Sequence, residues 1–293
     1  TILLDSLALL DKSVSETSVK SQARREKRII VAAVLIGVVI LGLSLFFVLS
    51  PALIVNSRDF SYPEELRTPA GSSPSLSITN VNGKVSISSW AQSTVAISGT
   101  VIARGLGSSP EQVVLSESNI NGVINFQAVF PSGSLFQLSD SYEAQIIVFI
   151  PLNTQFGLLK VETVNGGIDA RIANATNVQL NTVVGGIAIN CISCSNIAAS
   201  TNNGPVSATF SSLASSGQYT LTSINGNVAM TVPLTAGFSV HADTTNGTVD
   251  VSGVSLQPTG TVQLANDKTG KVDGGGASVR LHTVNGQVTI SLG

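Results

Sequence analysis

A short motif that recurs along the second half of the chain constrains its fold more than any other feature. Thr163-Val164-Asn165-Gly166-Gly167-Ile168 returns at 201–206 and 283–288, with variants at 223–228 and 244–249 and a copy at 182–187 that lacks the asparagine. The residue before the glycine falls at 165, 184, 203, 225 and 246, so the steps are 19, 19, 22 and 21 residues. Such a recurrence is typical of a solenoid with one β-coil per step.

Each copy of the motif lies between two stretches of alternating apolar residues. Apolar residues fall six and four places before the asparagine, and three and five places after it. This period of two is typical of β-strands, and Asn-Gly supplies the positive φ of a tight turn. We therefore predict an all-β fold, a single-stranded parallel β-helix in which the recurring Thr and Asn side chains form ladders between coils. An antiparallel sandwich with Asn-Gly hairpins is the alternative. The predicted turn residues are Asn165, Gly166, Asn203, Gly204, Asn225, Gly226, Asn246, Gly247, Asn285 and Gly286.

An uncharged apolar run at 29–49 follows a basic cluster at 24–28. As an α-helix the run would extend about 31 Å, close to the roughly 30 Å hydrocarbon core of a bilayer. Because the basic residues flank its amino-terminal side, we expect a single-pass transmembrane helix in the cell membrane, with the N-terminus cytoplasmic and the C-terminal domain extracellular. A cleaved signal sequence is the alternative, but the run is long for one and no small-residue cleavage site closes it.

Composition suggests the remaining boundaries. We expect residues 1–28 to be a cytoplasmic tail. As a helix it would have one apolar face suited to a membrane surface or a partner, and the alternative is that it folds only marginally. Four prolines mark 50–74 as a Pro/Ser/Gly stalk. Residues 75–152 begin with an imperfect copy of the motif at 82–83, which we expect to be the first coil. The strand patterns that follow have only one further copy, at 121–122, so we expect an irregular capping β region over 75–152. Residues 153–293 are expected to form the regular solenoid.

Side chains suited to catalysis or metal binding are scarce. The two histidines, His241 and His282, lie 41 residues apart at outward-facing offsets, so we predict no histidine-based catalytic or metal site. Asp250 and Asp273 would lie on neighbouring coils about 5 Å apart if Thr269 is the turn residue of its coil. This pair is a weak calcium candidate, and its spacing would also suit a glycan-cleaving β-helix. No aromatic platform for a sugar accompanies it, so we predict no enzyme and no cofactor.

The two cysteines and two glycosylation sequons fall in or near turns. Cys191 and Cys194 are the only cysteines, and outside the cell a disulfide is the natural prediction, with free thiols or a redox Cys-x-x-Cys as alternatives. The sequons begin at Asn174 and Asn246. Since Asn246 is also a turn asparagine, its sequon can arise from the repeat alone, and we favour a glycoprotein modified at Asn174.

Three features together connect the sequence to a known family. Val85-x-Ile87-x-x-Trp90 stands near the domain start, an apolar strand ends in Phe149-Ile150-Pro151, and the ordered motif copies follow. Over residues 75–293 this arrangement resembles the putative adhesin domain family, a prokaryotic envelope family of largely unknown function. The resemblance implies a membrane-tethered β-solenoid of the cell envelope. It implies no reaction and brings no catalytic residues.

Charge and composition narrow the function. Only 11% of the residues are charged and the net charge is −2, which gives no basic footprint for nucleic acid. We expect a membrane-anchored extracellular structural or adhesive protein that acts by protein or glycan contact. An accessory subunit of a membrane complex or surface filament is the alternative, and a glycan-cleaving enzyme is a weaker one.

The expected partners are the lipid bilayer and a protein partner or second copy. Self-association would use the transmembrane helix and the C-terminal coil. The strand at 288–293 would leave an open β-edge for such a contact, unless the loop 267–277 folds over it.

Overall fold

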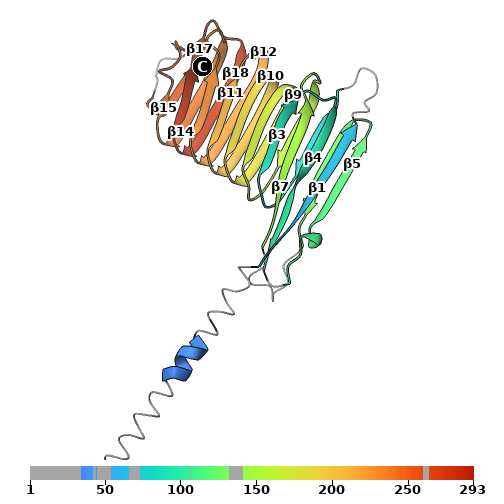
Figure 1. Ribbon diagram of the computed structural model, residues 1–293. Coiled ribbons are helices and arrows are strands. Elements are labelled where there is room, and N and C mark those ends of the chain that lie inside the picture. The colour runs from blue at the N-terminus through green and yellow to red at the C-terminus, as the bar shows by residue number, and fades with distance from the viewer. Residues whose placement is uncertain are drawn as a thin grey trace, which may run out of the picture. The chain divides into compact units, whose positions relative to one another are not determined.

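Parallel strands stacked in successive coils make up most of the computed structural model, which describes residues 34–41, 44, 54–65, 73–105, 107–131, 141–259 and 264–293 (Figure 1). The chain divides into two units, Thr1–Ile54 and Val55–Gly293. We call the second unit the β domain, because it contains every strand that the structure describes.

In the first unit, the structure describes a helical stretch at residues 34–41. Its large aliphatic side chains are 57% to 72% exposed. Among the described residues, no helix has the length and apolar character needed to cross a membrane. The expected span at 29–49 lies mostly outside the described residues, and the tail at 1–28 lies wholly outside them.

The strands wrap into two faces, because each coil places one strand before its turn and one after it. We call these the upstream face and the downstream face. Neighbouring strands of the upstream face are β5 (Val114–Ile120), β6 (Val123–Val129), β2 (Ser75–Thr79), β8 (Phe156–Glu162), β9 (Ile168–Val184), β10 (Ile187–Asn203), β12 (Leu213–Asn225), β18 (Ala277–Asn285), β14 (Phe238–Asn246), β17 (Asp267–Val272) and β16 (Gln257–Pro258).

The downstream face shares β9 and β10, whose first halves lie there. Its neighbouring strands are β1 (Val55–Glu65), β4 (Thr94–Arg104), β7 (Ser141–Pro151), β3 (Val85–Trp90), β9, β10, β11 (Val206–Phe210), β13 (Val228–Val232), β19 (Val288–Leu292) and β15 (Val249–Asp250). One short 3₁₀ helix, η1 (Pro110–Gln112), precedes β5.

A break in the side-chain alternation lets β9 and β10 pass from one face to the other. In β9 the residues that point inward are Ile168, Ala170 and Ile172, then Ala175, and then Val178 and every second residue after it up to Thr182. The two steps of three residues turn the strand at 172–178 while keeping apolar side chains inside. The same shift occurs in β10, so the two corners stack.

Most strand pairs between coils are parallel, as the repeat predicts. Antiparallel pairs occur at both ends of the stack, where β1, β4 and β7 pair in succession, β5 pairs with β6, and β17 pairs with β14 and β16. The prediction of a β-rich fold is therefore right, while the strand network as a whole is mixed rather than wholly parallel.

The order of coils in the stack differs from their order in the chain. The terminal coil, β18 and β19, lies between the coil of β12 and β13 and the coil of β14 and β15. β12 pairs with β18 rather than with β14, so Tyr219 stands beside Val279. The chain must leave the stack after β13, build the outer coil and its cover, and then return to fill the layer between them.

This insertion corrects the expectation of an open C-terminal edge. β19 pairs along its whole length with β13, and its first two residues pair with β15 on the other side. The end of the upstream face is covered instead by β17 and β16, and Val254 and Leu256 pack on the core nearby. The terminal coil therefore has no free upstream edge for self-association.

The opposite end of the β domain corrects one more expectation. β1 occupies 55–65 and pairs with β4 along eleven positions, so this part of the predicted stalk at 50–74 is a strand. Pro63 is tolerated because β1 is an edge strand. Strands β2 and β3 form the first coil expected from the copy of the motif at 82–83, and it lies in the stack between β6 or β7 and β8 or β9.

A single hydrophobic core runs through the β domain between the two faces. It is built from rows of like residues, one per coil, such as Ile168, Ile187, Val206, Val228 and Val288 in register on the downstream face. Burying a Val, Leu or Ile side chain contributes about 1.5 to 3 kcal/mol. This recurring gain, supplied by both faces, offsets the chain entropy lost in each coil.

Candidate functional site

The asparagines of the turns form a ladder along one corner of the β domain. Side-chain amide bonds of 2.7–2.9 Å join neighbouring coils. They run from Asn165 to Asn82, Asn225 to Asn203, Asn285 to Asn225 and Asn246 to Asn285. Val184 occupies the place of the asparagine in its coil, between Asn165 and Asn203, and interrupts the ladder. This corner is a structural element that fixes the register of the coils.

A second ladder lies just inside the first and uses hydroxyl groups. Each buried Thr or Ser two places before the turn residue donates to a glycine carbonyl of the neighbouring coil, at 2.8–3.0 Å. The donors are Thr182, Thr201, Ser223, Thr283 and Thr244. Thr163 is the exception, since its buried Oγ1 has no hydrogen-bond partner in the described part of the chain. The equivalent acceptor in the coil beneath it, the Gly83 carbonyl, accepts from Asn80 instead.

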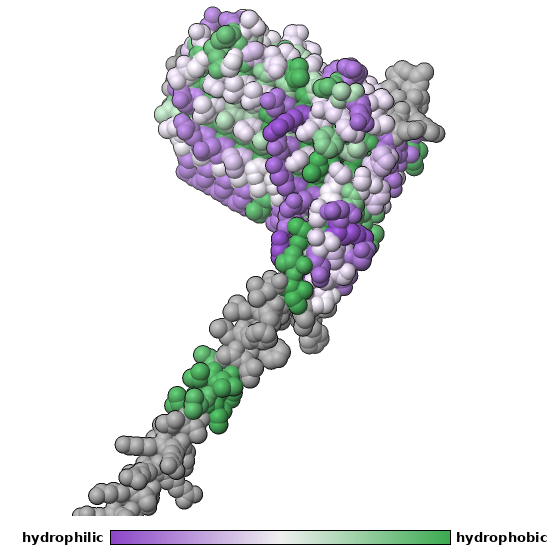
Figure 2. Space-filling view, in the orientation of Figure 1, coloured by the Kyte–Doolittle hydropathy of each residue, from purple (hydrophilic) through white to green (hydrophobic). Residues whose placement is uncertain are grey.

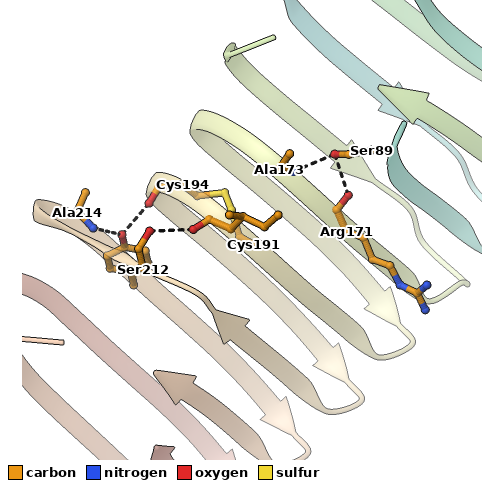
Figure 3. The surroundings of a disulfide bond; sticks show 9 residues. Ser89, Arg171, Ala173, Cys191, Cys194, Ser212 and Ala214 are labelled. Atoms are coloured by element: carbon orange, nitrogen blue, oxygen red, sulfur yellow. Dashed lines mark hydrogen bonds between the residues drawn. A yellow bond between two sulfur atoms is a disulfide. The ribbon is translucent and has the colours of Figure 1, made fainter. Parts of the chain in front are cut away.

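The opposite corner contains the disulfide between Cys191 and Cys194 (Figure 3). Both cysteines are buried, while Ile192 between them is 53% exposed. Tyr219 donates to the Cys194 carbonyl at 2.7 Å and accepts from the Ala214 backbone at 2.9 Å. Burial raises the pKa of Tyr219 more than the bond from Ala214 lowers it. The disulfide therefore stiffens a corner that is also tied to the next coil.

A shallow groove of about 300 Å³ lies on the downstream face beside this corner. Ser88, Arg171 and Asn190 contribute polar groups to it, and Leu152 and Ile192 contribute apolar ones. The Arg171 side chain is 71% exposed, and its Nε is 3.8 Å from Asp169. The backbone beneath is fixed, because Ser89 donates to the Arg171 carbonyl and accepts from the Ala173 amide (Figure 3).

Two aromatic rings lie next to the groove. Trp90 and Phe149 stack with ring centroids 5.1 Å apart, from the neighbouring strands β3 and β7. The indole N–H donates to the Thr94 carbonyl at 2.8 Å, which fixes the ring. Both side chains are partly exposed; Trp90 lies two residues after Ser88 on β3, and Phe149 lies directly opposite Ser88 on β7. A partly exposed aromatic pair beside hydroxyl, amide and guanidinium groups is suited to contact with a sugar or a peptide.

The two histidines, which are 41 residues apart in the sequence, come together in the structure. The insertion of β18 beside β14 places His282 directly opposite Asp243, and His241 lies two residues before Asp243 on the same surface. His282 Nδ1 is 2.6 Å from Asp243 Oδ2, and His241 Nε2 is 3.3 Å from Asp243 Oδ1. Since the partner strand is set by stack order, the spacing of the histidines in the sequence gave no indication of this cluster.

The predicted pairing of Asp250 with Asp273 on neighbouring coils is wrong. Thr269 is no turn residue, because it lies within β17 opposite His241 on the upstream face. Asp273 follows β17 with a φ of 46°, whereas Asp250 belongs to β15 on the downstream face. A hydrogen bond from Ser252 lowers the pKa of Asp250, so that carboxylate is satisfied locally.

The two sequon asparagines differ in environment. Asn246 is exposed, but its side-chain nitrogen donates to Asn285 at 2.8 Å in the turn ladder. Asn174 is partly exposed in the corner of β9, opposite Ser193. Modification at Asn246 would remove a ladder donor, so Asn174 remains the favoured position as a prediction.

Comparison with protein-family models gives a match that spans most of the chain. The model described as Toastrack DUF4097 matches residues 64–291. The chain belongs to the Toastrack DUF4097 family. The matched range nearly coincides with the region, 75–293, in which the sequence resembles putative adhesins. No curated protein matches the chain.

Solved structures of low sequence identity match this chain over most of its length. A putative cell adhesion protein from Clostridium sporogenes is 13% identical, with a TM-score of 0.45, and the match covers 81% of this chain and 100% of that one. A putative adhesin from Bacteroides fragilis is 10% identical, with a TM-score of 0.36 and coverage of 83% and 98%. A putative adhesin from Parabacteroides merdae is 9% identical, with a TM-score of 0.31 and coverage of 80% and 95%.

The surface of this Toastrack domain combines little charge with many small polar side chains. Figure 2 shows a face that is largely pale and purple, with scattered green patches. The groove beside Trp90 is the part of this surface that brings aromatic, cationic and amide groups together. It is the candidate contact site.

Proposed function

We propose that this Toastrack protein is a membrane-anchored extracellular contact protein, whose β domain binds a glycan or protein surface through the groove on its downstream face. The observation that carries the proposal is the partly exposed Trp90–Phe149 pair beside Arg171, Asn190 and Ser88. Aromatic and Arg side chains are the residues that most often anchor such interfaces. The rigid backbone of stacked coils holds the groove in its bound shape before contact, which limits the entropy lost on binding.

Membrane attachment is supported by the sequence and by the exposed helical stretch. The apolar run at 29–49 is long enough to span a bilayer and follows a basic cluster at 24–28. The aliphatic side chains at 34–41 are largely exposed. Such exposure is unfavourable in water and favourable in lipid. The proposed orientation has the N-terminus inside and the β domain outside.

The orientation can be tested with a tag at each end of the full chain in intact cells. External protease, or an impermeant biotin reagent, should reach the C-terminal tag and spare the N-terminal one. Labelling of the N-terminal tag in sealed cells would contradict the proposed topology. The tags serve as matched controls for each other, so resistance of the solenoid to protease does not confuse the result.

The contact site can be tested by adhesion of cells that display the full chain. Arg171→Ala and Asn190→Ala should each lower adhesion about tenfold or more, as expected for residues at the centre of an interface. Thr209→Ala, an exposed change further along the same face, is the control and should leave adhesion unchanged. If the groove variants adhere as well as the wild type while reaching the surface in equal amounts, the groove is not the contact site.

An accessory subunit is the alternative function for the same place in the cell. A mild-detergent pull-down would distinguish the two. The accessory subunit would be favoured by a partner that is recovered in fixed stoichiometry and that still binds the groove variants. The segment at 29–49 would then be the docking element.

A further inference from the structure

Both histidines of the chain meet at one carboxylate on the outer surface of the upstream face. Asp243 and His241 come from β14, His282 from β18 and Asp267 from β17. Asp243 is directly opposite His282 on one side and Asp267 on the other, so three adjoining strands supply the cluster. Neighbouring strands are about 4.8 Å apart, which places all four side chains within reach of one point above Asp243.

The cluster contains a carboxylate oxygen that lacks a donor among the described residues. Asp243 Oδ1 is buried and accepts no hydrogen bond from them, although His241 Nε2 lies 3.3 Å away. His241 is held from its other nitrogen, where Nδ1 is 2.8 Å from Thr269 Oγ1 and 3.8 Å from Asp267 Oδ1. An enclosed carboxylate oxygen without a donor is unfavourable, and a bound cation would satisfy it.

We propose that His241, Asp243, His282 and Asp267 form a binding site for a divalent transition-metal ion such as Zn²⁺. Two imidazole nitrogens with two carboxylates are a ligand set that Zn²⁺ favours, whereas Ca²⁺ favours oxygen ligands alone. As the side chains stand, no three His, Cys, Asp or Glu groups in the described part of the chain converge on a metal position. Binding therefore replaces the His282–Asp243 hydrogen bond and turns the imidazoles toward a shared ion.

The surroundings permit this rearrangement. The side chains are partly exposed, from 24% for Asp243 to 46% for Asp267, so they can change rotamer without displacing the core. Arg280, which lies opposite His241, is exposed and can turn its charge toward solvent. The two carboxylates leave the cluster with anionic charge that balances a divalent ion.

The position of the site indicates its effect. It joins the inserted terminal coil to the outer coil and to the strand that covers it. An ion that bridges β18, β14 and β17 would bind the folded arrangement and not the unfolded chain, and so would stabilise this end of the stack. The site is independent of the groove and of the proposed contact function.

The test is a titration of the full chain in detergent with Zn²⁺ alone, after removal of metals with a chelator. We expect saturable binding of one ion per chain and a rise in melting temperature that a chelator reverses. With Co²⁺ as a probe, visible absorption bands should appear at the same stoichiometry. His241→Gln and His282→Gln should each weaken binding by about tenfold or more, and Asp267→Asn should weaken it also. His282→Gln should still melt cooperatively without metal, since its side chain lies outside the core.

Asp250→Asn is the matched control, because it removes an outward carboxylate of the downstream face and should leave Zn²⁺ affinity unchanged. No saturable binding by the wild type would overturn the proposal. Binding that persists unchanged in both histidine variants would also overturn it, because the ion would then be held by scattered surface carboxylates.

Discussion

At the scale of single residues, hydroxyl and amide groups that occur once per coil hold neighbouring coils in register. The apolar rows alone would tolerate small shifts, because Val, Ile and Leu pack without directional bonds. A buried hydroxyl that donates to one particular carbonyl adds direction, and loss of the donor leaves the carbonyl unsatisfied. The ladder thus gives each coil a defined position at modest energetic gain.

The two kinds of ladder threonine provide a paired test. Thr201→Val removes the 2.9 Å bond to the Gly185 carbonyl and should lower the free energy of unfolding by about 1 to 3 kcal/mol. Thr163→Val removes a buried hydroxyl that has no hydrogen-bond partner, so it should change stability by less than about 0.5 kcal/mol or raise it slightly. Chemical denaturation of both variants gives the comparison. Equal losses would show that the ladder bonds do not contribute.

A carboxyl pair near the N-terminal end of the β domain should make stability depend on pH. Burial raises the pKa of Glu117, and the charge of Glu64 and a hydrogen bond with it raise the pKa further. Below the ordinary carboxyl pKa, Glu117 is protonated in both the folded and the unfolded chain, so its raised pKa does not lower the free energy of unfolding. As pH rises toward the raised pKa, the unfolded chain loses its proton first, so the folded state becomes relatively less stable.

Glu117→Gln should therefore raise the melting temperature at pH 7 and leave it nearly unchanged at pH 3. Melting curves of the variant and the wild type across this range provide the measurement. Glu111→Gln is a control at an exposed carboxylate paired with Arg58, and it should not reproduce the gain. A gain that is equal at both pH values would contradict the assigned cause.

At the scale of the element, the turn requires glycine for two separate reasons. Gly204 has a φ of +152°, and a Cβ there would lie 2.2 Å from the Gly185 carbonyl oxygen. Gly274 also has a positive φ, +78°, but a Cβ there would meet nothing within 4 Å. Coils that stack this closely need glycine for space as well as for conformation.

Alanine at the two glycines separates the two effects. Gly204→Ala should destabilise the protein by about 2 to 5 kcal/mol, from strain and from the clash with the next coil. Gly274→Ala should cost about 1 to 2 kcal/mol, since only the conformational strain remains. Denaturant midpoints of the two variants test this order. If Gly274→Ala lowers the free energy of unfolding more than Gly204→Ala does, close stacking of the coils is not the reason that the turn requires glycine.

The elements that follow the repeat could be predicted from sequence, and those that depend on neighbours could not. The turns, the inward rows and the ladder positions recur with the motif, so one coil predicts the next. β1 was hidden because Pro63 suggests a stalk, although an edge strand accepts proline. The candidate contact site depends on residues that meet across strands, such as Ser88 with Phe149 and with Arg171, and their spacing in the sequence gave no indication of this.

At the scale of the whole molecule, the recurring motif in the sequence could not predict the order in which the coils stack. β14 with β15 and β18 with β19 carry the same spacing of apolar residues, threonine and asparagine around the turn, so either coil fits beside β12 and β13. Tertiary contacts decide between them. Phe238 pairs with Val272 of the covering strand, which is suited to an end layer, whereas β18 pairs with a parallel strand on each side.

The inserted order determines the contacts of the distal end. It brings the histidines together, pairs β18 of the terminal coil on both sides and leaves β16 and β17 as the cover. It also makes folding of this end non-local, because the outer coil must wait for the C-terminal residues before its layer can close.

A cysteine cross-link measures the inserted order directly. Thr220 and Arg280 face outward on β12 and β18 and are paired in register, so Thr220→Cys with Arg280→Cys should form a disulfide under mild oxidation. Thr220→Cys with His241→Cys should stay unlinked, because β14 lies two strands away from β12, at about 10 Å. Peptide mapping without reduction identifies the linked peptides. A link in the first pair alone is the predicted result, and a link in the second pair alone would show that the coils stack in chain order.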